Sequence, residues 1–302
     1  IDGHKTAPND IEITSGGKIW LSSTNNSLFG DGGGRVFSST DGVTFQEKYA
    51  ISSGDRTQIA VSKTNPDKVY VLSEIPNSVA IIKTTNSFNT ITNLPLPIDA
   101  DSGIPATDFT RGQAFYDLLI GMNPTNENEV YVGGIEIFRT TTAFTANATS
   151  MWTQLTDWTV NPASSGTTPT LDGVHSDHHC IAFAPGQTSR VVFGNDGGVY
   201  YTNNSGTNIY VRNNGYNVTQ FYKAGISQTG TLKMIGGLQD NGTWTASSTT
   251  KENTAWHQDG SYPYKALGGG DGMQVQVDTR DNTTVYAGSQ FGAYARANKN
   301  SP

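Results

Sequence analysis

The chain has 302 residues, of which 35% are hydrophobic and only 15% charged, and its formal net charge is −7. This acidic balance argues against a protein that binds the phosphate backbone of nucleic acids, and no apolar run approaches the ~18 residues of a membrane-spanning helix. The 34 glycines, together with 12 Phe, 13 Tyr and 5 Trp, indicate instead a fold of many short strands joined by turns. The single cysteine, Cys180, excludes an internal disulfide.

A two-strand unit recurs along the chain and sets its organisation. In each copy a short alternating strand is followed by a turn rich in Pro, Asn or Asp, and then by a second strand of the Val-Tyr type. The second strands are expected to begin near positions 19, 69, 130, 192, 234 and 285. Because they recur about every 40–60 residues, the copies have the period of four-stranded propeller blades.

The segments that follow the second strands recur as well, at 35–45, 81–91, 137–145 and 199–210. We interpret each as a third strand, a tight turn and a fourth strand, and no segment has an uninterrupted helical period. The sequence therefore predicts an all-β fold, a β-propeller of four-stranded antiparallel blades, six of them visible. The sixth copy ends before a fourth strand, so we expect residues 1–302 to be a single β-propeller domain cut from a larger secreted protein, with seven or eight blades in the full ring. A six-bladed ring closed by the termini is the alternative.

Polar and aromatic side chains gather on one face of the predicted propeller. The links that enter the innermost strands and the turns after the second strands lie together around the channel mouth, where propellers commonly carry their sites. We predict a shared ligand-binding rim there, formed by Tyr116, Glu136, His175, Asp177, His179, Asp196, Gln239, Asp240, Asn241 and Asp271. A second interpretation stays open for Asp196, Asp240 and Asp271, since Asp before Gly or Asn-Gly also suits a tight turn.

The motif His-Ser-Asp-His-His-Cys at 175–180 has three possible interpretations: a structural Asp–His network, contact with a ligand, or a metal site. In an extended segment His175, Asp177 and His179 would point one way, and His178 and Cys180 the other. His178 would then be packed, and Cys180 would be a small buried residue. His-x-Asp-x-His is a usable ligand spacing, but no further ligand is specified. We therefore expect no metal site and no cofactor, with a bound cation such as calcium as the alternative.

Several segments carry a resemblance to a known family. "VHSDHHCIAFAP", "FGNDGGVYYTNN", "GGLQDNGTW" and "GGGDGMQVQVD" resemble the BNR/Asp-box propellers of secreted Bacteroidetes-type proteins, often labelled glycosyl hydrolase or sortilin-like. The turn "SSTDGVTF" looks like a shortened Asp-box, so we assign Asp41 a structural role and no chemistry. The resemblance implies a β-propeller of seven or more blades, export beyond the outer membrane and further domains in the same parent chain. It implies no settled activity.

Three functions remain open. The first is a secreted or cell-surface module that binds polysaccharide or a protein partner through the rim, because aromatic faces stack on sugar rings and polar side chains bond hydroxyls. Candidate stacking residues are Tyr116, Trp244, Trp256, Tyr262 and Tyr264. The other two functions are a glycoside hydrolase, which needs two facing carboxyls, and a structural bead of a surface adhesin or filament.

If the protein is a glycoside hydrolase, we expect its two catalytic carboxyls to come from a set of four aspartates. The candidates, which we expect to share one face, are Asp177, Asp196, Asp240 and Asp271. A sialidase is not expected, because the arginines do not recur at rim positions. We also expect no nucleic-acid partner and no transmembrane segment.

Overall fold

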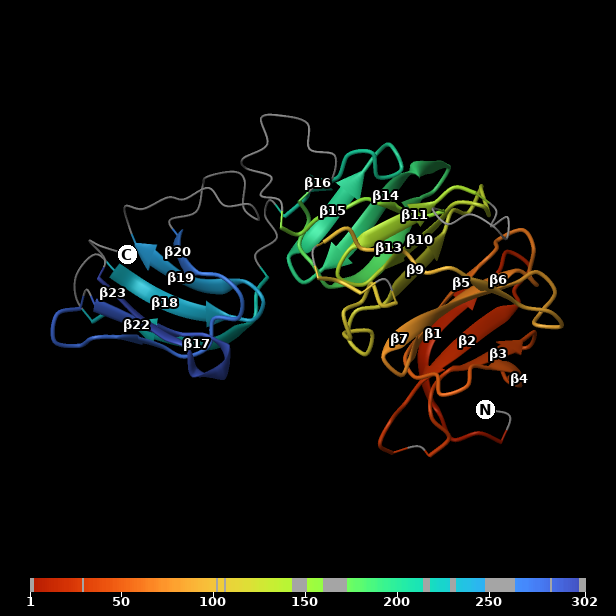
Figure 1. The fold of residues 1–302 in the computed structure, drawn as a ribbon, viewed down its shortest axis with the longest axis horizontal. Coiled ribbons are helices and arrows are strands. Elements are labelled where there is room, and N and C mark those ends of the chain that lie inside the picture. Colours follow the sequence, from red (N-terminus) through yellow and green to blue (C-terminus); the bar gives the residue numbers. More distant parts are fainter. Residues whose placement is uncertain are drawn as a thin grey trace. The chain divides into compact units, whose positions relative to one another are not determined.

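The structure is a computed structural model that describes residues 3–28, 30–101, 103–105, 107–142, 151–159, 173–213, 218–228, 232–247, 264–282 and 284–298. Within these residues the strands form six antiparallel sheets, five of four strands and one of three, and each sheet keeps its strands in chain order (Figure 1). This is the predicted all-β propeller fold. In the described part of the chain, no helix is long and apolar enough to cross a membrane.

The chain divides into two compact units. The first unit holds the first four sheets, apart from the end residues Gly198 and Val211. Its strands are β1 (Ala7–Ile13), β2 (Ile19–Thr24), β3 (Arg35–Ser39), β4 (Gln46–Ala50), β5 (Thr57–Val61), β6 (Val69–Ile75), β7 (Ser78–Thr84), β8 (Thr92–Leu94), β9 (Leu119–Met122), β10 (Val130–Gly133), β11 (Ile137–Thr140), β12 (Thr153–Gln154), β13 (His178–Ala184), β14 (Gln187–Asn195), β15 (Gly198–Thr202) and β16 (Tyr210–Val211).

The second unit holds the last two sheets. Its strands are β17 (Phe221–Ile226), β18 (Leu232–Leu238), β19 (Gly242–Ser247), β20 (Tyr264–Gly268), β21 (Val275–Val277), β22 (Thr284–Gly288) and β23 (Tyr294–Asn298). The three-residue 3-10 helix Gln290–Gly292 joins β22 to β23. The last sheet has no fourth strand within the described residues, as the sequence predicts.

The predicted second strands begin where expected in five of the six sheets, to within two residues. The exception is β14, which begins at Gln187 rather than near position 192. Gly186, with φ +70°, closes a tight turn directly before it. The polar residues after this turn therefore continue the hairpin, although their sequence resembles a loop.

Neighbouring sheets of the first unit meet through their innermost strands: β1 contacts β5, β5 contacts β9, and β9 contacts β13. Polar side chains of β1 reinforce the first of these contacts. The amide of Asn9 donates to the carbonyl oxygen of Thr57, and the Asp10 carboxylate accepts from the Ile59 backbone N–H. Apolar clusters fill the space between successive sheets, one of them centred on Trp20, Ile59 and Val71.

Three turns on the side opposite the predicted rim are each held by a side-chain oxygen that accepts from a backbone N–H further along the same turn. The Asp41 carboxylate accepts from the backbone N–H groups of Val43 and Thr44. Asn86 and Asn204 lie in two corresponding turns, where the side-chain oxygen of each accepts from the backbone N–H four residues on. The hydrogen bonds from the Thr44 and Val43 backbone hold the pKa of the Asp41 carboxyl at about 2, below its usual value. Asp41 thus has the structural role that the sequence predicts.

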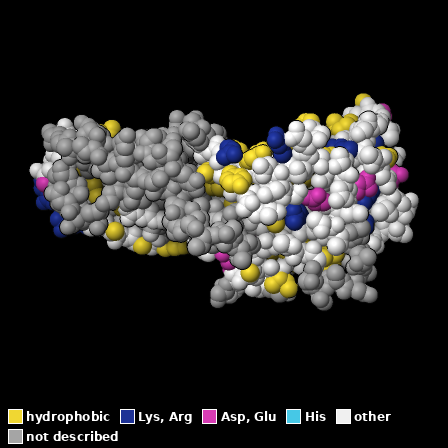
Figure 2. All heavy atoms as spheres, turned by 90° about the horizontal axis from the view of Figure 1, so that it is seen from above, with side chains coloured by type: hydrophobic (Ala, Val, Ile, Leu, Met, Phe, Trp, Pro, Cys, Tyr) yellow, Lys and Arg dark blue, Asp and Glu magenta, His cyan; other side chains and the backbone are white. Residues whose placement is uncertain are grey.

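The face shown in Figure 2 is mainly white, the colour of uncharged polar side chains and backbone, where residues are described. Lysine and arginine side chains are scattered singly over it and form no stripe. This agrees with the low charge content of the sequence.

Candidate functional site

The predicted rim of the first unit is built from segments at one end of its sheets. β11 and β12 are antiparallel, so the turn before β11 and the segment after β12 meet at the same end, where the Leu155 backbone N–H donates to the Ile137 carbonyl. The links that enter β9 and β13 lie at this end too. Each of these strands is antiparallel to the strand that follows it, so β9 begins beside the end of β10, and β13 begins beside the end of β14. Three acidic residues and two exposed aromatic residues lie on these segments.

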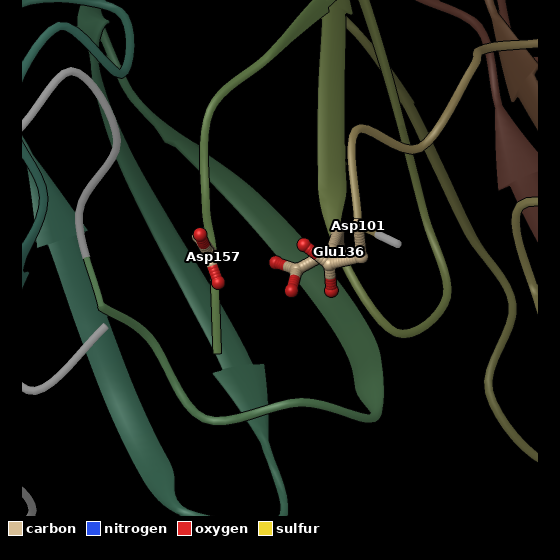
Figure 3. A group of neighbouring side chains, drawn as sticks. All are labelled: Asp101, Glu136 and Asp157. Atoms are coloured by element: carbon tan, nitrogen blue, oxygen red, sulfur yellow. The ribbon is translucent and has the colours of Figure 1, made fainter. Parts of the chain in front are cut away.

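Asp101, Glu136 and Asp157 form an acidic group whose nearest carboxylate oxygens lie within 4.8 Å of one another. The three carboxyls converge from the link before β9, the turn before β11 and the segment after β12 (Figure 3). Glu136 is one of the predicted rim residues, but it has no exposed surface. It can therefore act on a ligand only through its neighbours.

Both oxygens of Glu136 accept hydrogen bonds from the segment after β12. The Thr156 hydroxyl donates to one oxygen at 2.5 Å, and the Trp158 backbone N–H donates to the other at 2.8 Å. Burial outweighs these bonds and raises the pKa of the Glu136 carboxyl to about 8. Glu136 thus fixes the backbone that carries Asp157 and Trp158.

The two other acids of this group are partly exposed and already have partners. The Arg111 guanidinium donates to Asp99 at 2.9 Å and to Asp101 at 2.5 Å. Asp157 accepts from the backbone and the hydroxyl of Thr159. Oxygen ligands of this kind suit Ca²⁺ or Mg²⁺, but every carboxyl here has a hydrogen-bond donor, so we assign no ion to this group.

Two aromatic side chains project from the same segments. Trp158 follows Asp157 and is 44% exposed, and Phe115, on the link before β9, is 66% exposed. Tyr116 is partly buried, and its ring meets that of His179 edge-on, with the centroids 4.9 Å apart. The structure thus brings together two of the predicted binding residues, Tyr116 and His179.

The His-Ser-Asp-His-His-Cys motif is not evenly extended, because Asp177 has a left-handed φ of +64°. His175, Asp177 and His178 are all buried. The Asn195 amide donates to the His175 carbonyl oxygen at 2.6 Å, which joins the end of β14 to the link that enters β13. The prediction that Cys180 is buried is wrong, since it is exposed with its sulfur lying over Gly194, where no side chain intervenes.

A second group of charged residues lies in or just before the innermost strands and near the end of β6, outside the rim residues selected above from the sequence. Arg56 lies directly before β5; burial lowers the pKa of its guanidinium, and the charges of Asp117, Glu74 and Asp10 oppose that shift. Asp117 is completely buried; burial first, and then the charge of Asp177, raise its carboxyl pKa to about 9. Arg56 and Asp117 each stand five residues before the end of their innermost strand, so alignment of the repeats could have revealed this group.

The predicted rim residues of the second unit form a separate polar network. The Asp271 carboxylate accepts from the Asp240 backbone N–H at 2.7 Å and from the Gln290 side-chain amide. Gln239 and Asn241 flank Asp240 in the turn between β18 and β19. Asp196 lies in the turn between β14 and β15 and belongs to this unit as well.

Some predictions stay untested. Asp177 lies in the first unit, whereas Asp196, Asp240 and Asp271 lie in the second, so their common face stays a prediction. Trp244 is half-buried, and its indole N–H donates to the Asn241 carbonyl oxygen. Trp256 and Tyr262 lie outside the described residues; Tyr264 begins β20, with its side chain undescribed.

Comparisons with known proteins bear only on the fold of this chain. No protein-family model and no curated protein sequence matches the chain. Similar solved structures include the GH74 enzyme of Niastella koreensis, at 13% identity and a TM-score of 0.47, covering 95% of this chain and 41% of that one. The GH74 xyloglucanase of Xanthomonas campestris has 12% identity and a TM-score of 0.47, with 99% and 45% covered.

A third similar structure is YCF48 bound to a D1 peptide, at 12% identity and a TM-score of 0.42, covering 99% of this chain and 81% of that one. The chain spans less than half the length of the two GH74 enzymes. The class that the sheets define is therefore the β-propeller, and at these identities the likeness says nothing about activity.

Proposed function

We propose that the chain is a carbohydrate-binding propeller that recognises a polysaccharide through the rim of its first unit. One observation carries this proposal: the exposed Trp158 stands beside the acidic group Asp101–Glu136–Asp157, and the buried Glu136 holds its backbone. Phe115 adds a second exposed aromatic ring to the rim.

The chemistry of these groups suits a polyhydroxylated ligand. An aromatic ring offers a flat apolar face for the C–H face of a sugar, while carboxylate oxygens accept hydrogen bonds from its hydroxyls. Asp101 and Asp157 are the accessible acceptors, and Arg111 and Thr159 fix their carboxylates. Because these partners lock the site before a ligand arrives, little conformational entropy is lost on binding.

The setting of this function is part of the proposal. We infer that the parent protein is a secreted or cell-surface protein of the BNR/Asp-box type, in which this propeller is joined to further domains. The support is the order of the sequence motifs and the Asp41 turn with its two Asn-based counterparts.

Replacing Trp158 with alanine should weaken polysaccharide binding about tenfold, equivalent to about 1.4 kcal/mol, because the stacking face is removed. Isothermal titration against a panel of β-glucan, xyloglucan and sialylated glycans would measure the change. Tyr210→Ala is the matched control, since Tyr210 is an aromatic residue of similar exposure, 45%, on the outer strand β16 of another sheet.

Equal losses in the Trp158 and Tyr210 variants would contradict a site at the rim. If no polysaccharide of a broad panel binds, the alternative of a protein partner at the same face becomes the better explanation.

One observation also bears on the glycoside hydrolase alternative. The nearest carboxylate oxygens of Asp101 and Asp157 lie within 4.8 Å, close to the roughly 5–5.5 Å between carboxyls of retaining enzymes. The carboxyl with the raised pKa, Glu136, has no surface from which to protonate a leaving group. Binding is therefore the better proposal; release of reducing ends that stops in Asp157→Asn would reverse this order.

A further inference from the structure

Phe115 lies on a long link at the rim, and side-chain packing fixes little of its position, because most of the side chain is exposed. The link, residues 95–118, joins β8 to β9, and its described residues belong to no helix or strand. Loops of more than ~12–15 residues without secondary structure are uncommon in compact domains and are usually functional. The hydrogen bonds that hold this link therefore decide where the Phe115 ring lies.

The sheets hold the link at several points along its length. Near its start, the Gln154 side-chain oxygen accepts from the Ala100 backbone N–H at 2.8 Å. Further along, the Ser78 hydroxyl donates to the Thr107 carbonyl oxygen. Both contacts come from strands or strand ends of neighbouring sheets and lie several residues before Phe115. The end of the link needs an anchor of its own.

Arg56 supplies this anchor. One terminal nitrogen of its guanidinium donates to the carbonyl oxygen of Phe115 at 3.1 Å and also to that of Tyr116. Hydrogen bonds from a charged donor are roughly twice as strong as those between neutral groups. A single side chain thus holds two consecutive peptide groups, those that flank the backbone N–H and carbonyl of Tyr116.

Arg56 is itself fixed to the second sheet. It directly precedes β5, and its carbonyl oxygen accepts from the Glu74 backbone N–H at 2.8 Å, while the Asp55 N–H donates to the Glu74 carbonyl oxygen at 2.9 Å. Its side chain is partly buried, and the charges of Asp117, Glu74 and Asp10 favour the charged guanidinium. The position of the second sheet is therefore passed on to the end of the link.

Hydrogen bonds within the link close the same turn from its inner side. The Gln113 carbonyl oxygen accepts from the backbone N–H groups of Tyr116 at 2.7 Å and Asp117 at 3.0 Å. The N–H groups of this turn are thus bonded inside the link, and the carbonyls of Phe115 and Tyr116 are bonded to Arg56. Fixing a backbone before a ligand arrives lowers the conformational entropy that binding costs.

We propose that Arg56 is a positioning residue of the polysaccharide site, a role that rests on the proposed function: its guanidinium fixes the backbone of Phe115 and Tyr116 so that the Phe115 ring is held in place for a sugar. Glu136 does the same for the other exposed ring of the rim, since its carboxylate accepts from the Trp158 backbone N–H at 2.8 Å. Each ring has its own anchor, so the two anchors should act independently.

Hydrogen exchange tests the anchor without any ligand. Arg56→Met keeps the apolar stem and removes the donors, so the amides of Tyr116 and Asp117 should exchange about tenfold faster than in the wild type. Arg139→Met is the matched control, because the Arg139 guanidinium also donates to a backbone carbonyl, that of Ser205, in a turn on the side opposite the predicted rim. It should leave both amides unchanged. Unchanged exchange in Arg56→Met would overturn the proposal.

A double-mutant cycle measured by calorimetry with the polysaccharide panel tests the role in binding. Arg56→Met should weaken binding about fivefold, and it should add nothing to Phe115→Ala, in which the positioned ring is gone. In the Trp158→Ala background the fivefold loss should remain. An unchanged affinity, or equal losses in the two backgrounds, would overturn the positioning role.

The two experiments separate this inference from the proposed function. If the wild type binds no polysaccharide but Arg56→Met speeds exchange at Tyr116 and Asp117, the proposed function fails and Arg56 remains the anchor of the link. Should Arg56→Met not fold, Arg56→Gln takes its place with the same expectation, because its amide is too short to reach both carbonyls.

Discussion

Replacing Trp20 with alanine is expected to lower the free energy of unfolding by about 3–5 kcal/mol. Trp20 has no exposed surface, and its ring packs edge-on against Phe88, with the centroids 5.7 Å apart. Its indole N–H donates to the Pro66 carbonyl oxygen at 2.9 Å. Because Phe88 and Pro66 lie in turns that join strands of the second sheet and Trp20 lies in the first sheet, the substitution removes a main contact between two blades.

Chemical denaturation followed by circular dichroism would measure this loss. Trp20→Phe keeps most of the buried apolar area but not the indole hydrogen bond, so it should cost less than the alanine variant. Val43→Ala is the control, because Val43 is 84% exposed and surface substitutions change stability by about 0.5 kcal/mol or less. A loss below about 1 kcal/mol for Trp20→Ala would show that the blades do not depend on this contact.

The strands follow from the sequence because the repeat makes each one visible several times. The pairs Val69 with Val61 and Val130 with Met122 occupy equivalent positions in two sheets, so one copy supports the other. The outermost strands are harder to predict: β12 and β16 have only two residues each. So short a segment has no period, and its pairing is decided by the neighbouring strand.

The candidate site is predictable only in part. Loop position places Glu136 and Tyr116 at the end of the sheets where we predict the rim, because topology alone decides at which end a loop lies. Burial is decided by side chains distant in sequence: Glu136 is covered through Thr156, twenty residues away. Trp158 acquires its importance from such a contact with Glu136, so nothing in its local sequence distinguishes it.

Replacing Glu136 with glutamine should remove a pH dependence of stability from this protein. Burial raises the pKa of the Glu136 carboxyl from 4.5 to about 8, so the folded state holds a proton that the unfolded state releases. The stability from this proton is complete below pH 4.5 and is lost as the pH rises to about 8. The shift corresponds to a loss of up to about 5 kcal/mol across this window.

Glutamine is a suitable replacement because its oxygen can accept from the Trp158 N–H while its amide donates to the Thr156 hydroxyl oxygen. The variant should therefore equal the wild type in stability at low pH and exceed it above about pH 8. Asp10 and Asp117 titrate in both proteins, so the difference between the two unfolding curves isolates Glu136.

Glu127→Gln is the control for Glu136→Gln, because the pKa of the Glu127 carboxyl is lowered and not raised. The Glu127 carboxyl is partly buried, but hydrogen bonds from Ser62, Thr64 and Lys68 outweigh that burial and lower its pKa to about 2. It is ionised in both states above its ordinary pKa, so this variant should keep the wild-type slope between pH 4.5 and about 8. Parallel curves for the wild type and Glu136→Gln would mean that Glu136 is ionised in the folded protein, and that its carboxylate is compensated by a charge beside Asp101 and Asp157.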